Sequence, residues 1–167
     1  MELATIGFFR AKWTSKIHDE WIENLLINRP DISREQLYRT RDLMNSAVMD
    51  SIVVEYESLI DALHLPDAED RHVLAAAIHC SADAIITFNL SDFPEVELKK
   101  YNLEAQHPDE FIFQQFGLDH ARMIIAARIV RARLKNPVKS PEAFLETLRL
   151  QQLPKTVAAL APYLGVI

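Results

Sequence analysis

The sequence predicts an α/β protein with a mostly parallel sheet flanked by helices, followed by a helical extension. Two observations lead to this prediction. Segments with strand character alternate with helical segments up to about residue 107, and such alternation is typical of a parallel sheet covered on both faces. Beyond that point only helical patterns occur, and prolines separate them. We therefore expect an α/β domain over residues 1–107 and a helical extension, residues 108–167, packed on it.

Capping residues and breaks in the apolar pattern mark the elements of the first domain. The opening MELATIG is typical of the last turns of a helix that ends at Gly7. Ser15 is a suitable N-cap, and Ser33 and Gln36 have the spacing of a capping box. The predicted helices cover residues 15–28, 34–49, 55–63, 67–80 and 95–100, and the predicted strands cover residues 51–56, 84–88 and 103–105.

The second part of the chain contains helical patterns alone. Pro137, Pro141, Pro154 and Pro162 interrupt them and set the turns. The predicted helices of the extension cover residues 109–116, 119–134, 141–151 and 155–164.

Composition limits the class of protein. A chain of 167 residues with 49% hydrophobic and 25% charged residues can bury a core, and its net charge of −6 argues against nucleic-acid binding over the whole surface. Cys80 is the only cysteine, which excludes an internal disulfide and a thiolate-rich zinc site. The sequence shows no membrane span and no signal peptide, so we expect a cytoplasmic protein without membrane contact.

Acidic residues occur where the predicted helix at 67–80 begins. Asp67 follows Pro66 at the N-cap position, and Asp70 lies three residues later, where a capping box places its second acid. Helix capping alone accounts for both residues. Asp70 also extends the apolar stripe of Val73 and Leu74 backward, so its side chain is expected to face the sheet.

Glu20 has a similar position on another helix. It falls between Ile17 and Trp21 on the apolar side of the predicted helix at 15–28. Since an unpaired carboxylate facing a core is costly, we expect a cation, a hydrogen-bond network or water beside it.

A third polar group follows the predicted strand at 84–88. Thr87, Asn89, Ser91 and Asp92 lie at or just beyond its carboxyl end, where open α/β sheets hold their ligands. A right-handed crossover brings the start of the preceding helix to the same edge. Oxygen ligands of this kind suit Mg²⁺ or Mn²⁺. A simple turn without a metal ion is the alternative, because Asn and Asp favour turns.

These motifs resemble a known family. The segment DRHVLAAAIHCSADAIITFNLSDFP resembles the second half of a PIN domain, the metal-dependent ribonuclease fold of VapC-like toxins in bacterial toxin–antitoxin pairs. The segment WTSKIHDEWIENLL is similar to the helix that carries an essential Glu in that fold. The likeness covers roughly residues 8–109, and the tail resembles one branch of the family.

The resemblance implies a site and a reaction. Glu20, Asp70, Asn89 and Asp92 would be the catalytic and metal-binding residues, and Asp67 could join them. The cofactor would be Mg²⁺ or Mn²⁺, and the reaction would be hydrolysis of an RNA phosphodiester by an activated water. A protein antitoxin would be the partner.

One departure from the family concerns the first strand. PIN domains open with a strand that delivers an Asp to the site, whereas this chain begins with a helical pattern. We therefore expect the first strand and its Asp to be missing. An open place in the sheet favours pairing with another chain, so a homodimer or other self-association is expected.

Two alternatives remain from the sequence. The chain could be a truncated or degenerate PIN-like protein that acts as a binding or self-associating module without activity. It could also be another Mg²⁺-dependent phosphohydrolase, although such enzymes normally need an Asp nucleophile where this chain has Asn89.

Basic residues supply candidate RNA contacts. His18, Arg71 and His72 flank the acids and could touch phosphate. Arg128 and Arg131 belong to the basic segment RMIIAARIVRARLKNPVK, which could contact RNA or an acidic antitoxin. An ordinary solvated helix face is the alternative for that segment.

Overall fold

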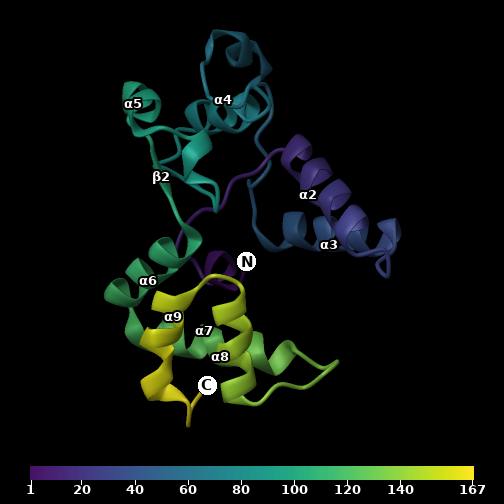
Figure 1. The fold of residues 1–167 in the computed structure, drawn as a ribbon, viewed down its shortest axis with the longest axis vertical. Coiled ribbons are helices and arrows are strands. Elements are labelled where there is room, and N and C mark those ends of the chain that lie inside the picture. The colour runs from purple at the N-terminus through teal and green to yellow at the C-terminus, as the bar shows by residue number, and fades with distance from the viewer. The chain divides into compact units, whose positions relative to one another are not determined.

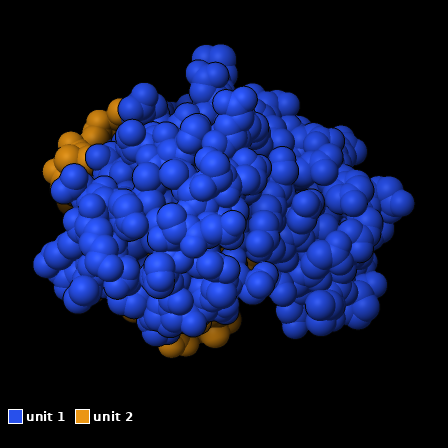
Figure 2. Space-filling view, turned by 90° about the horizontal axis from the view of Figure 1, so that it is seen from above, with its two compact units in different colours: residues 1, 3–85, 89–105 blue, residues 2, 86–88, 106–167 orange.

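The computed structural model describes residues 1–167, which form two compact units (Figures 1 and 2). Unit 1 comprises residues 1, 3–85 and 89–105, and unit 2 comprises residues 2, 86–88 and 106–167. Helices account for 61% of the residues, and a small parallel sheet pairs β1 (Ala84–Ile86) with β2 (Glu104–Gln106). The predicted α/β class with a C-terminal helical extension is confirmed, although the sheet is smaller than expected.

The first helices of unit 1 follow local capping rules. The short α1 (Glu2–Thr5) is followed by Gly7 at φ +79°, a left-handed conformation that favours glycine. The N-cap of α2 (Ser15–Asn28) is Thr14, whose side-chain oxygen accepts a hydrogen bond from Ile17 N at 3.1 Å. The prediction of Ser15 as the cap is therefore wrong by one residue.

The helix α3 (Arg34–Ala47) packs against α2 within unit 1 (Figure 1). Ser33 accepts a hydrogen bond from Gln36 N, and the Gln36 side chain accepts one from Ser33 N. The predicted capping box is thus confirmed.

The predicted strand at 51–56 is wrong. Only an isolated parallel bridge between Trp13 and Ile52 forms there. Glu55 adopts a left-handed φ of 63°, which ends the extended segment, and the 3₁₀ helix η1 (Glu57–Ala62) replaces the predicted α-helix.

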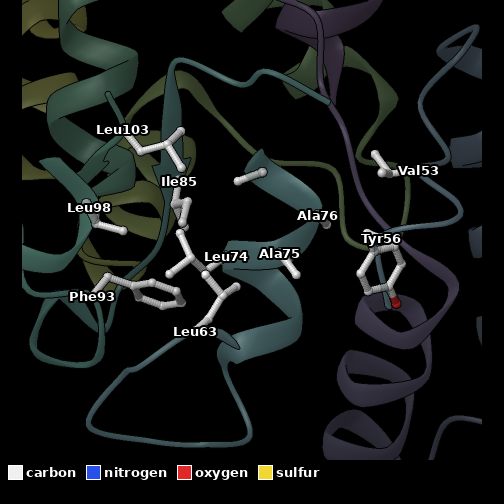
Figure 3. Close-up of a cluster of buried hydrophobic side chains, with 11 residues drawn as sticks. Val53, Tyr56, Leu63, Leu74, Ala75, Ala76, Ile85, Phe93, Leu98 and Leu103 are labelled. Carbon is white, nitrogen blue, oxygen red and sulfur yellow. The ribbon is translucent and has the colours of Figure 1, made fainter. Parts of the chain in front are cut away.

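The core of unit 1 surrounds α4 (Arg71–His79), which packs against η1. Leu74 is fully buried, and its side chain lies among Leu63, Ile85 and Phe93 (Figure 3). After β1 the chain forms three short helices: η2 (Leu90–Asp92), α5 (Glu95–Leu98) and η3 (Lys99–Tyr101). This segment and the residues next to it add Phe93, Leu98 and Leu103 to the core.

Unit 2 is helical. Its elements are α6 (Pro108–Leu118), α7 (His120–Arg133), α8 (Pro141–Leu150), α9 (Pro154–Leu160) and η4 (Ala161–Tyr163). Within this unit α9 packs against α6 and α8. Three of the α-helices, α6, α8 and α9, carry Pro in their first turn, where the missing backbone donor costs nothing. None of the helices has the length and apolar character needed to cross a membrane.

Candidate metal centre

The segment before α4 does not cap the helix as expected. The helix begins at Arg71, so Asp70 is the N-cap residue, and the Asp70 side chain makes no capping hydrogen bond. Asp67 Oδ1 instead accepts a hydrogen bond from Glu69 N at 2.8 Å, within the turn that precedes the helix. The predicted helix start at Asp67 and the predicted capping roles are both wrong. The carboxylate of Asp70 therefore does not cap the start of the helix.

Three carboxylates converge in unit 1. Asp67, Asp70 and Asp92 each offer one oxygen, and these oxygens lie within 4.8 Å of one another. Asp67 and Asp70 come from the turn before α4, and Asp92 ends η2, six residues after β1. Asp67 is exposed, and the other two are half-buried. The structure therefore brings Asp70 and Asp92 together and adds Asp67.

The electrostatics of this cluster favour a cation. Burial raises the pKa of Asp70, and the negative charges of Asp92 and Asp67 raise it further. Carboxylates this close resist simultaneous ionisation unless a positive charge is present. Since a set of carboxylate oxygens is the donor chemistry that Mg²⁺ and Mn²⁺ prefer, the three residues fit a hard divalent cation.

Asn89 contacts the cluster through Asp92. Its amide Nδ2 donates a hydrogen bond to Asp92 Oδ2, and its Oδ1 accepts one from Ser91 Oγ at 2.7 Å. Both polar atoms of the Asn89 side chain are thus occupied within the loop. This arrangement orients the Asp92 carboxylate.

Glu20 lies beside the cluster on α2. Its Oε1 atom is 2.8 Å from His72 Nε2 and 3.9 Å from Lys16 Nζ. Lys16 Nζ also lies 4.0 Å from Glu69 Oε2. The charge of Glu20 contributes to the raised pKa of Asp70, although Glu20 is not one of the three converging carboxylates. The neighbours of this carboxylate are therefore a histidine and a lysine.

His72 differs from the sequence expectation. Its side chain is only 1% exposed, so it cannot contact RNA from the surface as predicted. The approach of Nε2 to Glu20 lacks hydrogen-bond alignment, and Nδ1 has no partner. Burial lowers the pKa of His72, and the nearby Glu20 charge opposes this effect. The short contact therefore joins a predominantly neutral ring to Glu20 at neutral pH.

The other two residues predicted to contact RNA near the acids, His18 and Arg71, form hydrogen bonds within the protein. His18 is 1% exposed, with Nε2 2.9 Å from Asn45 Oδ1 and Nδ1 accepting from Trp21 Nε1 at 2.9 Å. The predicted RNA contact of His18 is therefore wrong. Arg71 is half-buried, and its Nε donates to Ala68 O at 3.0 Å within the turn before α4.

Lys16 was not predicted as part of this region. The spacing of Lys16 and Glu20, four residues apart on one helix, was the available signal, because such pairs lie side by side. Its second neighbour, Glu69, could not be read from spacing, since it belongs to a distant segment.

Comparisons with known proteins identify one family model and one relative. Residues 108–162 match the family model described as the VapC50 C-terminal domain. Over 104 residues the chain is 38% identical to the candidate ribonuclease VapC50 of Mycobacterium tuberculosis, and the match covers 62% of this chain and 60% of that relative. The chain thus spans less than two thirds of the relative's length. No solved structure matches the chain.

Proposed function

We propose that this chain, which belongs to the VapC-like PIN toxin family, is a metal-dependent ribonuclease of a toxin–antitoxin pair that hydrolyses RNA phosphodiesters. The observation that carries the proposal is the convergence of Asp67, Asp70 and Asp92 within 4.8 Å. The relative's description as a ribonuclease supports the same activity.

Each residue of the region has a proposed role. Asp70 and Asp92, with Asp67, hold Mg²⁺ or Mn²⁺ through carboxylate oxygens. A bound cation of this kind neutralises phosphate charge and lowers the pKa of water. Asn89 fixes the orientation of Asp92 through its amide. Glu20, which lies beside His72 and Lys16, supplies a fourth carboxylate near the three.

The phosphohydrolase alternative receives less support from this arrangement. That chemistry uses a nucleophilic Asp at the end of a strand. Here the loop after β1 carries Asn89 where such an Asp would be needed, and the Asn89 amide contacts Asp92 and Ser91. An amide is not a nucleophile of this kind, so hydrolysis without a covalent enzyme intermediate is the better proposal.

The partners and location belong to the same proposal. A ribonuclease toxin acts on cellular RNA and is held by a protein antitoxin, which implies a cytoplasmic location. The sheet has only two strands, and a small sheet can grow when a second copy adds a strand. Homodimer formation is proposed on that ground.

Cleavage of single-stranded RNA tests the proposed activity. The purified chain is incubated with RNA and Mn²⁺ or Mg²⁺, beside Asp70→Asn and an EDTA control. Asp83→Asn is the matched control, because Asp83 is an exposed acid outside the cluster. We expect metal-dependent cutting by the wild type and by Asp83→Asn, and none by Asp70→Asn.

Equal cutting by all three proteins would point to a contaminating nuclease. No cutting by the wild type would contradict the proposal that this polypeptide is itself a ribonuclease. It would leave the binding module as the supported reading.

A further inference from the structure

Charge is unevenly distributed along the chain. Residues 1–105 contain 10 basic and 19 acidic residues, a net charge of −9, whereas residues 106–167 contain 8 basic and 5 acidic residues, a net charge of +3. The candidate metal centre therefore belongs to a strongly acidic part of the protein. A polyanion is repelled by that part at long range.

Several cations of unit 2 are already paired with acids. Arg133 pairs with Glu2, Arg149 with Glu146, and Lys155 with Glu110. The acids therefore offset the charges of these three cations locally.

A group of four other cations lies in the second half of α7 and in the segment that connects α7 to α8. None of them forms an ion pair within 4 Å. We name this group the α7 basic surface, and it consists of Arg128, Arg131, Lys135 and Lys139.

The α7 basic surface is held together by specific contacts. Arg131 Nη1 donates to the carbonyl oxygen of Lys139 at 2.8 Å, and Lys139 Nζ donates to Thr147 Oγ1 at 2.6 Å. An antiparallel bridge between Lys135 and Val138 closes the connecting segment into a tight turn. The backbone is thus fixed close to the helix end, while Lys135 itself is exposed.

Arg128 extends the surface along the helix. It is exposed and lies three residues before Arg131, so the two side chains emerge on the same face of α7. Cations in the last turn of a helix also offset its dipole, which accounts for Arg131. The dipole does not account for Arg128, which lies before the last turn of the helix, or for Lys135, which lies beyond the helix end.

We propose that the α7 basic surface binds the phosphate backbone of single-stranded RNA and so supplies the attraction that the acidic part of the chain lacks. This inference rests on the proposed ribonuclease function, which makes RNA the polyanion concerned. Arginine forks bind phosphate oxygens in pairs, and the contact needs no particular base sequence. Because the two units belong to one chain, RNA held by unit 2 has a raised effective concentration at the acids.

The test measures binding without cleavage. Fluorescence anisotropy of a labelled oligouridine is followed in EDTA over a range of salt concentrations, with the full-length chain. The double variant Arg128→Gln/Lys135→Gln removes two exposed cations of the surface. Arg10→Gln/Arg39→Gln removes two exposed cations from unit 1 and serves as the matched control.

We expect the surface variant to bind roughly tenfold more weakly at low salt and to lower the slope of log K against log salt by about 1.4, at roughly 0.7 per lost phosphate contact. The control variant should retain the wild-type affinity and slope. Equal losses in both variants would overturn the proposal, since they would show an effect of net charge alone.

Two further outcomes would also overturn it. The first is no binding of oligouridine by the wild type. The second is equally tight binding of poly-glutamate, which would identify the surface as a docking site for an acidic protein. Because EDTA prevents metal-dependent cutting, a failure of this binding test is distinct from a failure of the cleavage test.

Discussion

His72 Nε2 lies 2.8 Å from Glu20 Oε1, and this contact joins the first turn of α4 to α2. The two helices lie far apart in sequence, yet Glu20 on α2 lies near the carboxylate of Asp70, the N-cap residue of α4. His72 is buried and Glu20 is half-buried, so the ring shields one side of the carboxylate from water. We infer that His72 positions Glu20.

The first prediction concerns the pH dependence of stability through His72. Burial lowers its pKa from 6.5; the Glu20 and Glu69 charges oppose this effect, and Lys16 adds to it. The folded state therefore binds this proton less tightly than the unfolded chain. Its stabilising contribution is present above pH 6.5 and is lost as the pH falls through the lower folded pKa. We expect the melting temperature in EDTA to fall between pH 7 and 5 by a smaller amount in His72→Gln than in the wild type.

The control for this prediction is His79→Gln. His79 lies on the same helix but is exposed, so its replacement should leave the pH profile unchanged. An identical profile for wild type and His72→Gln would show that the buried ring does not control the acid sensitivity. At pH 7 we expect His72→Gln to cost roughly 1–2 kcal/mol of unfolding free energy, because the packing around the buried ring is lost.

The second prediction concerns Asp70. Its pKa is raised by burial and by the charges of Asp92 and Asp67, so the folded state binds a proton more tightly than the unfolded chain. Stability therefore falls as the pH rises from 3.8 through the raised folded pKa. In EDTA at pH 7, Asp70→Asn removes the repulsion and should raise the melting temperature by roughly 1–3 °C.

Addition of Mn²⁺ should make the melting temperature of the wild type higher than that of Asp70→Asn. Wild type gains stability as Mn²⁺ binds the folded state, whereas Asp70→Asn has lost a ligand and should gain little. Differential scanning fluorimetry with a Mn²⁺ titration measures both effects, and Asp83→Asn is the control. A wild type that gains no stability from Mn²⁺ would contradict the assignment of the cluster as a metal site.

The sequence predicted that Asp70 and Asp92 lie close together, but not how the chain presents them, and Glu20, which was expected with them, is not one of the three converging carboxylates. Asp70 and Asp92 converge because a helix start and the end of a following parallel strand share one edge, a rule that depends on topology alone. The local conformation was not predictable in the same way. Asp67 bonds Glu69 N in a turn, because short polar side chains compete with the helix for backbone donors.

Burial was the least predictable property. His18 and His72 were expected near phosphate at the surface, yet both are 1% exposed. Their partners, Asn45 and Glu20, come from other helices, so no local pattern could indicate them. The predicted strand at 51–56 failed for a similar reason, since the left-handed Glu55 allows only a single bridge to Trp13.

The third prediction concerns the buried network around His18. Asn45 Oδ1 accepts a hydrogen bond from Trp13 Nε1 at 2.8 Å and contacts His18 Nε2 at 2.9 Å. Because Trp21 donates to Nδ1, the neutral ring carries its proton on Nε2 and donates to Asn45. Asn45→Ala would leave two donors without an acceptor, so we expect a loss of roughly 2–4 kcal/mol of unfolding free energy.

Chemical denaturation measures this loss, and Asn24→Ala is its control. Asn24 is an exposed residue on α2, so its replacement should change stability little. A loss of under roughly 0.5 kcal/mol for Asn45→Ala would show that water replaces the missing acceptor.

The fourth prediction concerns Asp109, which links α6 to the start of α9 within unit 2. Its carboxylate accepts hydrogen bonds from Lys155 N at 2.8 Å, Thr156 N at 2.9 Å and Thr156 Oγ1 at 2.8 Å. Asp109 is 4% exposed, so these donors have no ready replacement in water. We expect Asp109→Ala to cost about 3 kcal/mol and to speed hydrogen exchange in α9.

The pH dependence of this cap has the opposite sign to that of Asp70. Burial alone raises the pKa of Asp109, but hydrogen bonds from Thr156 and Lys155 outweigh it and lower the pKa from 3.8. The stability that the cap contributes is thus present above pH 3.8 and is lost as the pH falls through the folded pKa. Peptide-resolved hydrogen exchange should show α9 opening in acid in the wild type, while Asp109→Ala is open at neutral pH. Glu110→Ala is the control because Glu110 pairs with Lys155 at the surface, and protection of α9 equal to wild type in Asp109→Ala would contradict the capping role.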